Sequence, residues 1–249
     1  MLPLFKSHYS IGKSILTLKE PQASKEESAD SIFDILINNN LNKLVLVEDA
    51  PTGFLQARKI CFEEDIHLMF GLRISIKCFD DDETLSNHKV IIFSKNDEGC
   101  KRLNLIYSKI YCDHNGVGDY QILKKFWNED DLMLAIPFYD SFLYQNSFSF
   151  ASCIPDFSFC KPIFFTENNG LPTDDLLNNI VRNYCKDYNY EIIKAKSIYY
   201  NNRCDADALQ TYKCICNRNF SKSSSLSKPN LEGFGSREFC FQSWKENTK

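Results

Sequence analysis

The stretch that decides the fold is LVLVEDAPTGFLQARKICFEEDIHLMFGLRISI, residues 44–76. Its apolar runs predict a strand, then a helix that begins near Pro51, then a second strand. Before it, residues 2–10 (LPLFKSHYS) predict a strand, and residues 31–41 (SIFDILINNNL) predict a helix with Asp30 as its N-cap. This βαβαβ run predicts a parallel sheet with helices outside it.

The same alternation continues along the rest of the chain. Strands are predicted over residues 89–94 and 190–200, and helices over residues 98–111 and 173–188. The aromatic stretch from residue 126 to residue 165 has no clear period and is expected to be irregular. A chain of 249 residues with 43% hydrophobic residues is sufficient for one α/β domain.

Composition and charge limit the classes of function. The net charge is -4, and Lys and Arg are spread along the chain, so strong autonomous binding to nucleic acid is not expected. No signal peptide or membrane span is expected. The 11 cysteines lack the spacing of a disulfide framework, which indicates a reducing, cytoplasmic location.

Several blocks of the sequence resemble the PHP (polymerase and histidinol phosphatase) domain of the bacterial C-family replicative DNA polymerase III alpha subunit, in the same order. Residues 6–16 resemble the first motif of that family, and residues 44–76 resemble the second and third motifs. Residues 89–111 resemble a strand of the family that is followed by an Ala-Lys-Asn turn and a helix. Residues 169–200 resemble its Gly-Leu-Pro turn with the helix and strand that follow, and residues 204–215 resemble its final helix.

The resemblance implies a distorted (β/α)7 barrel, related to the TIM barrel, over residues 1–216. Residues 217–249 then form a Ser-rich loop and a C-terminal extension that packs on the barrel or trails it. In the family, His, Asp and Glu residues at the C-terminal ends of the strands hold divalent metal ions, which generate a hydroxide for phosphoester hydrolysis. The palm, fingers and thumb of the polymerase have no counterpart here, so no polymerase active site is expected.

At the positions where the family has metal-binding residues, this chain has other residues. His8 lies one strand step beyond the positions of the first motif. The substituted positions are Leu2, Lys6, Glu48, Asp49, Arg73, Lys89, Ser197 and Tyr199. Lys and Arg place positive charge where metal ions would bind, so no metal cofactor and no catalytic residue are expected. The alternative is a reduced Zn or Mn site that uses His8, or His88 in place of Lys89, together with the two carboxylates.

The two carboxylates at the end of the second strand would be left without metal ions. We therefore expect a side-chain cation, Lys6 or Arg73, to pair with Glu48 or Asp49. Arg73 is the favoured partner, because a planar guanidinium can hold a carboxylate through two hydrogen bonds.

The function implied is that of a catalytically inactive PHP-like domain, acting in DNA replication as a scaffold or polymerase-associating module. A separate DNA polymerase fragment or another replication protein would be its partner. One alternative is a metal-dependent phosphoesterase or 3'-5' exonuclease with a reduced metal site. A second alternative is a binding protein unrelated to replication.

Overall fold

The computed structural model of the protein describes residues 1–21, 29–77, 87–149, 152–216 and 235–248. The predicted Ser-rich loop, residues 217–233, lies outside the described residues.

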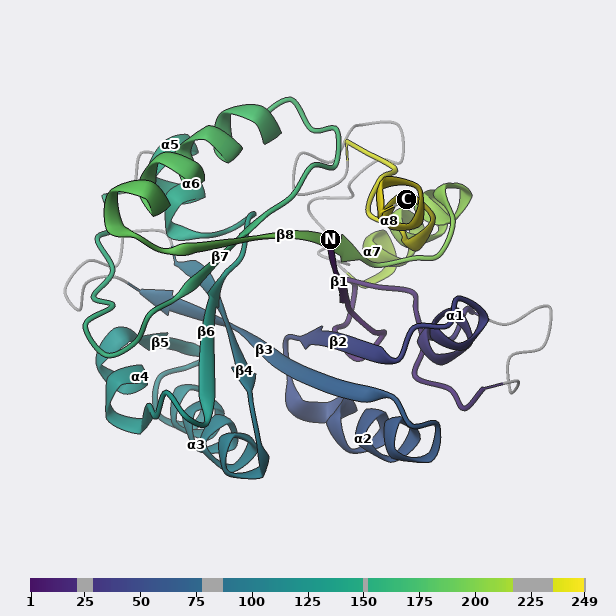
Figure 1. The fold of residues 1–249 in the computed structure, drawn as a ribbon, viewed down its shortest axis with the longest axis horizontal. Helices are drawn as coiled ribbons and strands as arrows, with labels where there is room; N and C mark the ends of the chain where they lie inside the picture. Colours follow the sequence, from purple (N-terminus) through teal and green to yellow (C-terminus); the bar gives the residue numbers. More distant parts are fainter. Residues whose placement is uncertain (22–28, 78–86, 150–151, 217–234, 249) are drawn as a thin grey trace. The chain divides into compact units, whose positions relative to one another are not determined.

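Strands and helices alternate along most of the chain (Figure 1). The strands are β1 (Leu2–Phe5), β2 (Lys43–Glu48), β3 (His67–Lys77), β4 (His88–Ser94), β5 (Val117–Asp119), β6 (Leu132–Ile136), β7 (Ile163–Thr166) and β8 (Glu191–Ile198). The helices are α1 (Ile32–Asn38), α2 (Phe54–Glu63), α3 (Asp97–Asp113), α4 (Tyr120–Phe126), α5 (Phe142–Phe148), α6 (Asp174–Tyr188), α7 (Ala206–Cys216) and α8 (Phe241–Thr248). Two short 3-10 helices are η1 (Pro51–Gly53) and η2 (Arg203–Asp205).

The strands form one mixed sheet in the order β2-β1-β8-β7-β6-β4-β3-β5. An additional pairing of β2 with β3 closes seven of these strands into a barrel, and β5 pairs with β3. This confirms the predicted α/β fold, a closed seven-stranded barrel with interleaved helices that is consistent with a distorted (β/α)7 barrel. The chain divides into two compact units: unit 1 comprises Met1–Met69, Asn168–Pro172 and Ala195–Lys249, and unit 2 comprises Phe70–Glu167 and Thr173–Lys194.

In unit 1, β1 pairs in parallel with both β2 and the second half of β8. The apolar side chains of these strands, such as Phe5 and Leu46, are fully buried. Helix α1 begins at the N-cap Ser31, whose hydroxyl accepts a hydrogen bond from the Phe33 amide; the sequence had placed this cap one residue earlier, at Asp30. Helices α7 and α8 also belong to this unit.

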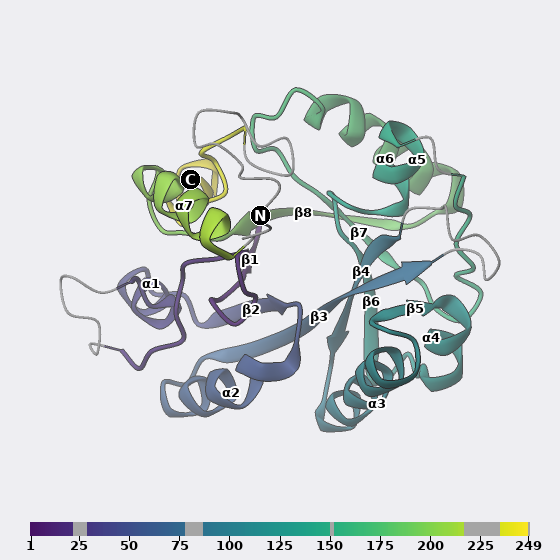
Figure 2. The ribbon, with the colours of Figure 1, turned by 180° about the vertical axis from the view of Figure 1, so that it is seen from behind.

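In unit 2, β4 is antiparallel to both of its neighbours, β3 and β6, while β6, β7 and the first half of β8 are parallel. The βαβαβ run of the first third predicted a parallel sheet, and the antiparallel pairing of β3 with β4 departs from it. Only residues 78–87 separate β3 from β4, and a parallel crossover needs about a dozen residues or more, so an antiparallel pair is the accessible arrangement. Helix α3 lies beside α4, and α5 lies beside α6 (Figure 2).

The stretch from residue 126 to residue 165, expected to be irregular, contains β6, α5 and β7. The prediction of irregular structure was wrong because both strands are short and almost wholly apolar. Four of the five β6 residues and all four β7 residues are buried, so neither strand shows the alternation that marks a half-exposed strand.

Within the described residues, no helix is long and apolar enough to cross a membrane. The described cysteines are free thiols apart from Cys153, which is disulfide-bonded. A disulfide framework of the kind that stabilises small secreted domains is therefore not seen in the described chain. The cytoplasmic location stays a prediction.

The C-terminal helix α8 is held to unit 1 by packing and by an ion pair. The Phe241 ring lies 6.1 Å from that of Phe5, and the Trp244 indole N–H donates to the Met1 carbonyl at 2.9 Å. The Arg203 guanidinium donates two hydrogen bonds, of 2.8 and 2.9 Å, to the carboxylate of Glu238. Two parallel hydrogen bonds from one guanidinium to one carboxylate are the geometry in which a partly exposed ion pair contributes most to stability.

Replacing Arg203 with Ala is expected to lower the free energy of unfolding by about 1 kcal/mol, because both side chains are about one-third exposed and water screens the pair. Amide exchange should accelerate in residues 236–248 more than elsewhere. The control is Lys101→Ala, which breaks an exposed pair with Glu98 and should have a smaller effect on stability. Unchanged exchange in α8 would contradict the anchoring role of Arg203.

Candidate functional site

The predicted site residues of unit 1 gather where β1 and β2 end. These two strands are parallel, with Phe5 opposite Leu46, so their C-terminal ends meet at the same edge of the sheet. We use the name β1–β2 cluster for Lys6, Ser7, Ser10, Glu48 and Asp49, which all lie at this edge.

The first interaction of the cluster joins a buried ammonium to a carboxylate. Lys6 Nζ donates to Asp49 Oδ1 at 2.8 Å, and the Lys6 side chain is 4% exposed while that of Asp49 is 33% exposed. The pair matches the expectation that a side-chain cation would bind one of the two carboxylates.

The second carboxylate of the cluster, that of Glu48, is fully buried. Its Oε1 accepts a hydrogen bond from the Ser7 amide at 2.8 Å, and its Oε2 accepts one from the Ser10 hydroxyl. The Ser10 oxygen accepts in turn from the Asp49 amide at 3.0 Å. Burial raises the pKa of Glu48, while the hydrogen bond from Ser10 and the charge of Lys6 act in the opposite direction.

His8 lies just after Lys6 and Ser7, and its amide donates to the Leu16 carbonyl at 2.7 Å. Its imidazole stacks on Tyr9, with ring centroids 4.4 Å apart, and its Nδ1 is buried without a hydrogen-bond partner in the described chain. Burial lowers the pKa of His8, so the neutral ring is favoured.

The remaining predicted positions of unit 1 make ordinary structural contacts. Leu2 and Ser197 belong to the paired strands β1 and β8. Tyr199 stacks on Phe239, with ring centroids 5.7 Å apart, and its carbonyl accepts a hydrogen bond from the Ser14 hydroxyl at 2.9 Å.

In unit 2, the two predicted cationic positions lie on the antiparallel strands β3 and β4. Arg73 Nη2 donates to Asp140 Oδ2 at 2.6 Å, and Lys89 Nζ donates to the hydroxyl of Ser75, its cross-strand neighbour. Asp140 was not among the predicted carboxylate partners of Arg73. It lies 67 residues further along the chain, so no local pattern links the two.

His88, the alternative metal ligand, is buried beside aromatic rings. Its Nε2 lies 2.8 Å from the Tyr120 hydroxyl, and the Phe142 ring meets it edge-on at 6.1 Å between centroids. Burial lowers the pKa of His88 to about 4 and raises that of Tyr120. Both groups are therefore neutral near pH 7. The other ring nitrogen of His88, Nδ1, lies 3.9 Å from Cys153 Sγ.

The chemistry available to the β1–β2 cluster is limited by its own hydrogen bonds. Glu48 has both oxygens occupied and no contact with solvent, so it is poorly placed to take a proton from a substrate. Among the described residues, no group of three or more His, Cys, Asp or Glu side chains is arranged to hold a metal ion.

Sequence reasoning missed Ser7 and Ser10, although these residues hold Glu48. A signal was present, because Ser7 and Ser10 flank His8 in a segment that resembles a family motif with a Ser-containing turn.

No protein-family model matches this chain, and no curated protein matches it.

Proposed function

We propose that this protein is a catalytically inactive PHP-like barrel that acts in DNA replication as a scaffold, associating with a separate polymerase fragment or another replication protein. The observation that carries the proposal is the Lys6–Asp49 pair, in which an ammonium occupies a position where the resembled family has a metal ligand. The closed barrel and the order of the sequence blocks support the relationship to that family.

The inactive state is tested first, by metal content and hydrolysis. After purification with Zn or Mn supplied, we expect less than one equivalent of either metal per chain, because the β1–β2 cluster presents two carboxylates and a competing cation. We also expect no release of nucleotide from single-stranded DNA and no hydrolysis of an aryl phosphate with either metal added.

The control variant for this test is Lys6→His, which replaces the cation with the residue type of the family. If the wild-type chain binds a full equivalent of metal and hydrolyses DNA, and if Asp49→Asn abolishes both properties, the protein is a phosphoesterase and the proposal is wrong.

The scaffold role is tested by affinity purification of the tagged chain from its native source, followed by mass spectrometry. Recovery of polymerase or clamp-loader subunits, absent from a tagged control protein, is the expected result. A reproducible set of partners without any replication protein would favour the alternative of a binding protein outside replication.

A further inference from the structure

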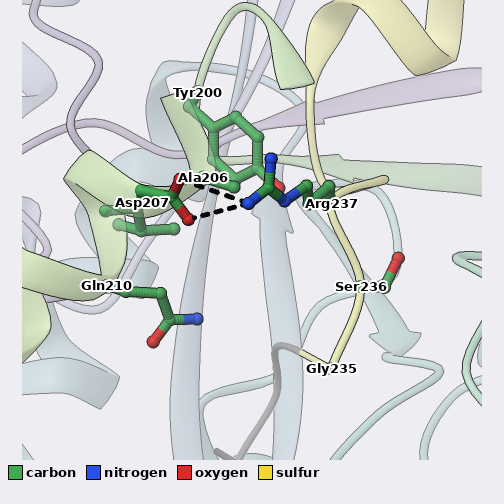
Figure 3. A pocket seen from close by; sticks show the side chains of 8 residues that line it. Tyr200, Ala206, Asp207, Gln210, Gly235, Ser236 and Arg237 are labelled. Atoms are coloured by element: carbon green, nitrogen blue, oxygen red, sulfur yellow. Dashed lines mark hydrogen bonds and ion pairs between the residues drawn. The ribbon is translucent and has the colours of Figure 1, made fainter. Parts of the chain in front are cut away.

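The pocket between α7 and the residues before α8, in unit 1, has its charged groups paired with each other. Arg237 Nη2 donates to both carboxylate oxygens of Asp207, at 3.1 and 3.2 Å, and Figure 3 shows this pair at the pocket. No described group there selects a ligand, so the pocket carries no inference. Unit 2 contains a feature of another kind, a disulfide sulfur beside a buried imidazole.

That sulfur belongs to Cys153, and the imidazole belongs to His88. Cys153 is disulfide-bonded, whereas the other described cysteines are free thiols. Its Sγ lies 3.9 Å from His88 Nδ1, and the two residues are 6% and 1% exposed. On the opposite side of the ring, Nε2 lies 2.8 Å from the Tyr120 hydroxyl. The sulfur therefore contacts a ring whose other nitrogen is already held.

The backbone of Cys153 is held by a side chain as well as by the disulfide. Asn146, in α5, donates from Nδ2 to the Cys153 carbonyl at 2.8 Å, and its Oδ1 accepts from the Cys153 amide at 2.9 Å. Neither hydrogen bond involves the sulfur, so reduction of the disulfide does not break them. We therefore expect Cys153 to stay beside His88 in the reduced chain.

A thiol at this position has a hydrogen-bond acceptor within reach. Buried thiols are protonated near pH 7, as at Cys185, where burial raises the pKa to about 12. An S–H group is a weak donor, and one nitrogen of a neutral imidazole is an acceptor. If the thiol donates to His88 Nδ1, the ring proton lies on Nε2, which then donates to the Tyr120 hydroxyl.

The disulfide form favours the opposite tautomer of His88. A disulfide sulfur has no proton to donate, so both ring nitrogens have a partner only when Nδ1–H points at the sulfur and Nε2 accepts from the Tyr120 hydroxyl. His88 is the first residue of β4, and Tyr120 is the first residue of α4. The two redox states therefore differ where this strand and this helix begin.

Cys153 is buried but lies close to the surface. Its neighbours Ser152 and Ile154 are exposed, Ile154 to 81%. A local opening of residues 152–154 is therefore sufficient to admit a small reductant. A disulfide that stands among free thiols, as in the described chain, also differs from the framework of a secreted domain. In reducing compartments such isolated bonds are usually transient and redox-sensing.

We propose that Cys153 and His88 form a redox-sensitive switch, in which a dithiol reduces the Cys153 disulfide and the resulting thiol donates a hydrogen bond to His88 Nδ1. The dithiol supplies two electrons and two protons and becomes a disulfide, while the two sulfurs that were joined each end as a thiol. The direction of the hydrogen bond between His88 and Tyr120 reverses with the redox state. The proposal does not depend on a role in replication.

The first test follows the thiols of the folded chain. The protein, oxidised with glutathione disulfide, is treated with dithiothreitol at pH 7 without denaturant, then quenched, alkylated differentially in urea and mapped by mass spectrometry. We expect Cys153 to change from disulfide to thiol while the near-UV circular dichroism of the folded chain is retained. Renewed treatment with glutathione disulfide should restore the bond.

The second test reads the tautomer of His88 by NMR of the chain labelled with ¹⁵N-histidine. On reduction, the Nδ1 resonance should shift to that of an unprotonated nitrogen and the Nε2 resonance to that of a protonated one. The control in the same spectrum is the exposed His67, whose two resonances should not move.

A pair of variants tests the thiol as a donor. Cys153→Ser supplies a hydroxyl that can donate to His88 Nδ1, and Cys153→Ala supplies no donor. We expect the Tm of the Ala variant to be about 2–4 °C below that of the Ser variant, the shift that one lost hydrogen bond causes in a chain of this size. The matched control is Cys185, also buried, where Ser should give no advantage over Ala.

Four results would overturn the proposal. They are a Cys153 disulfide that resists dithiothreitol until the chain unfolds, a chain that unfolds on reduction, a His88 tautomer that is the same in both redox states, and equal Tm values for Cys153→Ser and Cys153→Ala. The first two would identify a structural disulfide, and the last two would show that His88 does not respond to it.

Discussion

Replacing Lys6 with Met is expected to lower the free energy of unfolding by about 3 kcal/mol at pH 7, the scale for breaking a buried ion pair. The Lys6 side chain is 4% exposed, so its charge was removed from water on folding and is balanced by Asp49. Met fills a similar volume without charge. It leaves the Asp49 carboxylate without this cation and removes a positive charge that acts on the fully buried Glu48. Urea denaturation followed by circular dichroism measures the change.

The matched control is Lys59→Met, which breaks two exposed pairs, with Glu20 at 3.4 Å and with Glu63 at 3.7 Å. Because the Lys59 side chain is 62% exposed, the expected loss is below about 1 kcal/mol. In the double variant Lys6→Met with Asp49→Asn, part of the loss should be recovered, since neither charge is then left alone. If Lys6→Met lowers the free energy of unfolding no more than Lys59→Met does, the Lys6 ammonium does not compensate the negative charge of the β1–β2 cluster.

Acidification should destabilise the protein through His88, by about 3 kcal/mol between pH 6.5 and pH 4. In the folded chain, burial holds the pKa of His88 at about 4, below the ordinary value of 6.5. The unfolded chain therefore binds the proton more readily. The stability is fully present above pH 6.5 and is lost progressively as the pH falls toward 4. Urea denaturation at a series of pH values measures the effect.

The comparison variant is His88→Gln, which keeps a polar partner for the Tyr120 hydroxyl but does not titrate. Its stability should fall less steeply below pH 6.5 than that of the wild type. The control is His67→Gln, at an exposed position at the start of β3. The raised pKa of Glu48 acts in the opposite direction and is common to all three proteins, so the difference between curves isolates His88. If the free energy of unfolding falls equally steeply with decreasing pH in the wild type and in His88→Gln, His88 is not the cause of the loss.

The fold was predictable from the sequence wherever the apolar residues had a period or lay between clear turns. Helix α6 is an example, because Leu177, Val181 and Cys185 recur four residues apart and are buried. The same helix begins at Asp174, one residue after the start of the predicted range, and the Thr173 side chain makes no capping hydrogen bond. The direction of β4 was not predictable from periodicity, since an apolar strand has the same pattern in parallel and antiparallel sheets.

The site was predictable only in part. The resemblance together with charge balance led to the expectation that Lys6 or Arg73 meets Glu48 or Asp49. The Lys6–Asp49 pair confirms this for Lys6, whereas the preference for Arg73 was wrong. The pair of Arg73 with Asp140 and the hydrogen bond of His88 with Tyr120 were not foreseen. Contacts of this kind depend on how distant strands and helices pack, and no local sequence pattern encodes them.

The ammonium of Lys6 differs from a bound metal ion in one thermodynamic respect. A bound metal ion stabilises a protein by an amount that grows with the logarithm of the free ion concentration once that exceeds Kd. The stability of a metal-dependent fold therefore changes with metal supply and chelation. The Lys6 charge is attached to the chain and is delivered whenever β1 and β2 pair. The positive charge that compensates the β1–β2 cluster is therefore part of the chain itself, and its presence does not depend on the concentration of free metal ions.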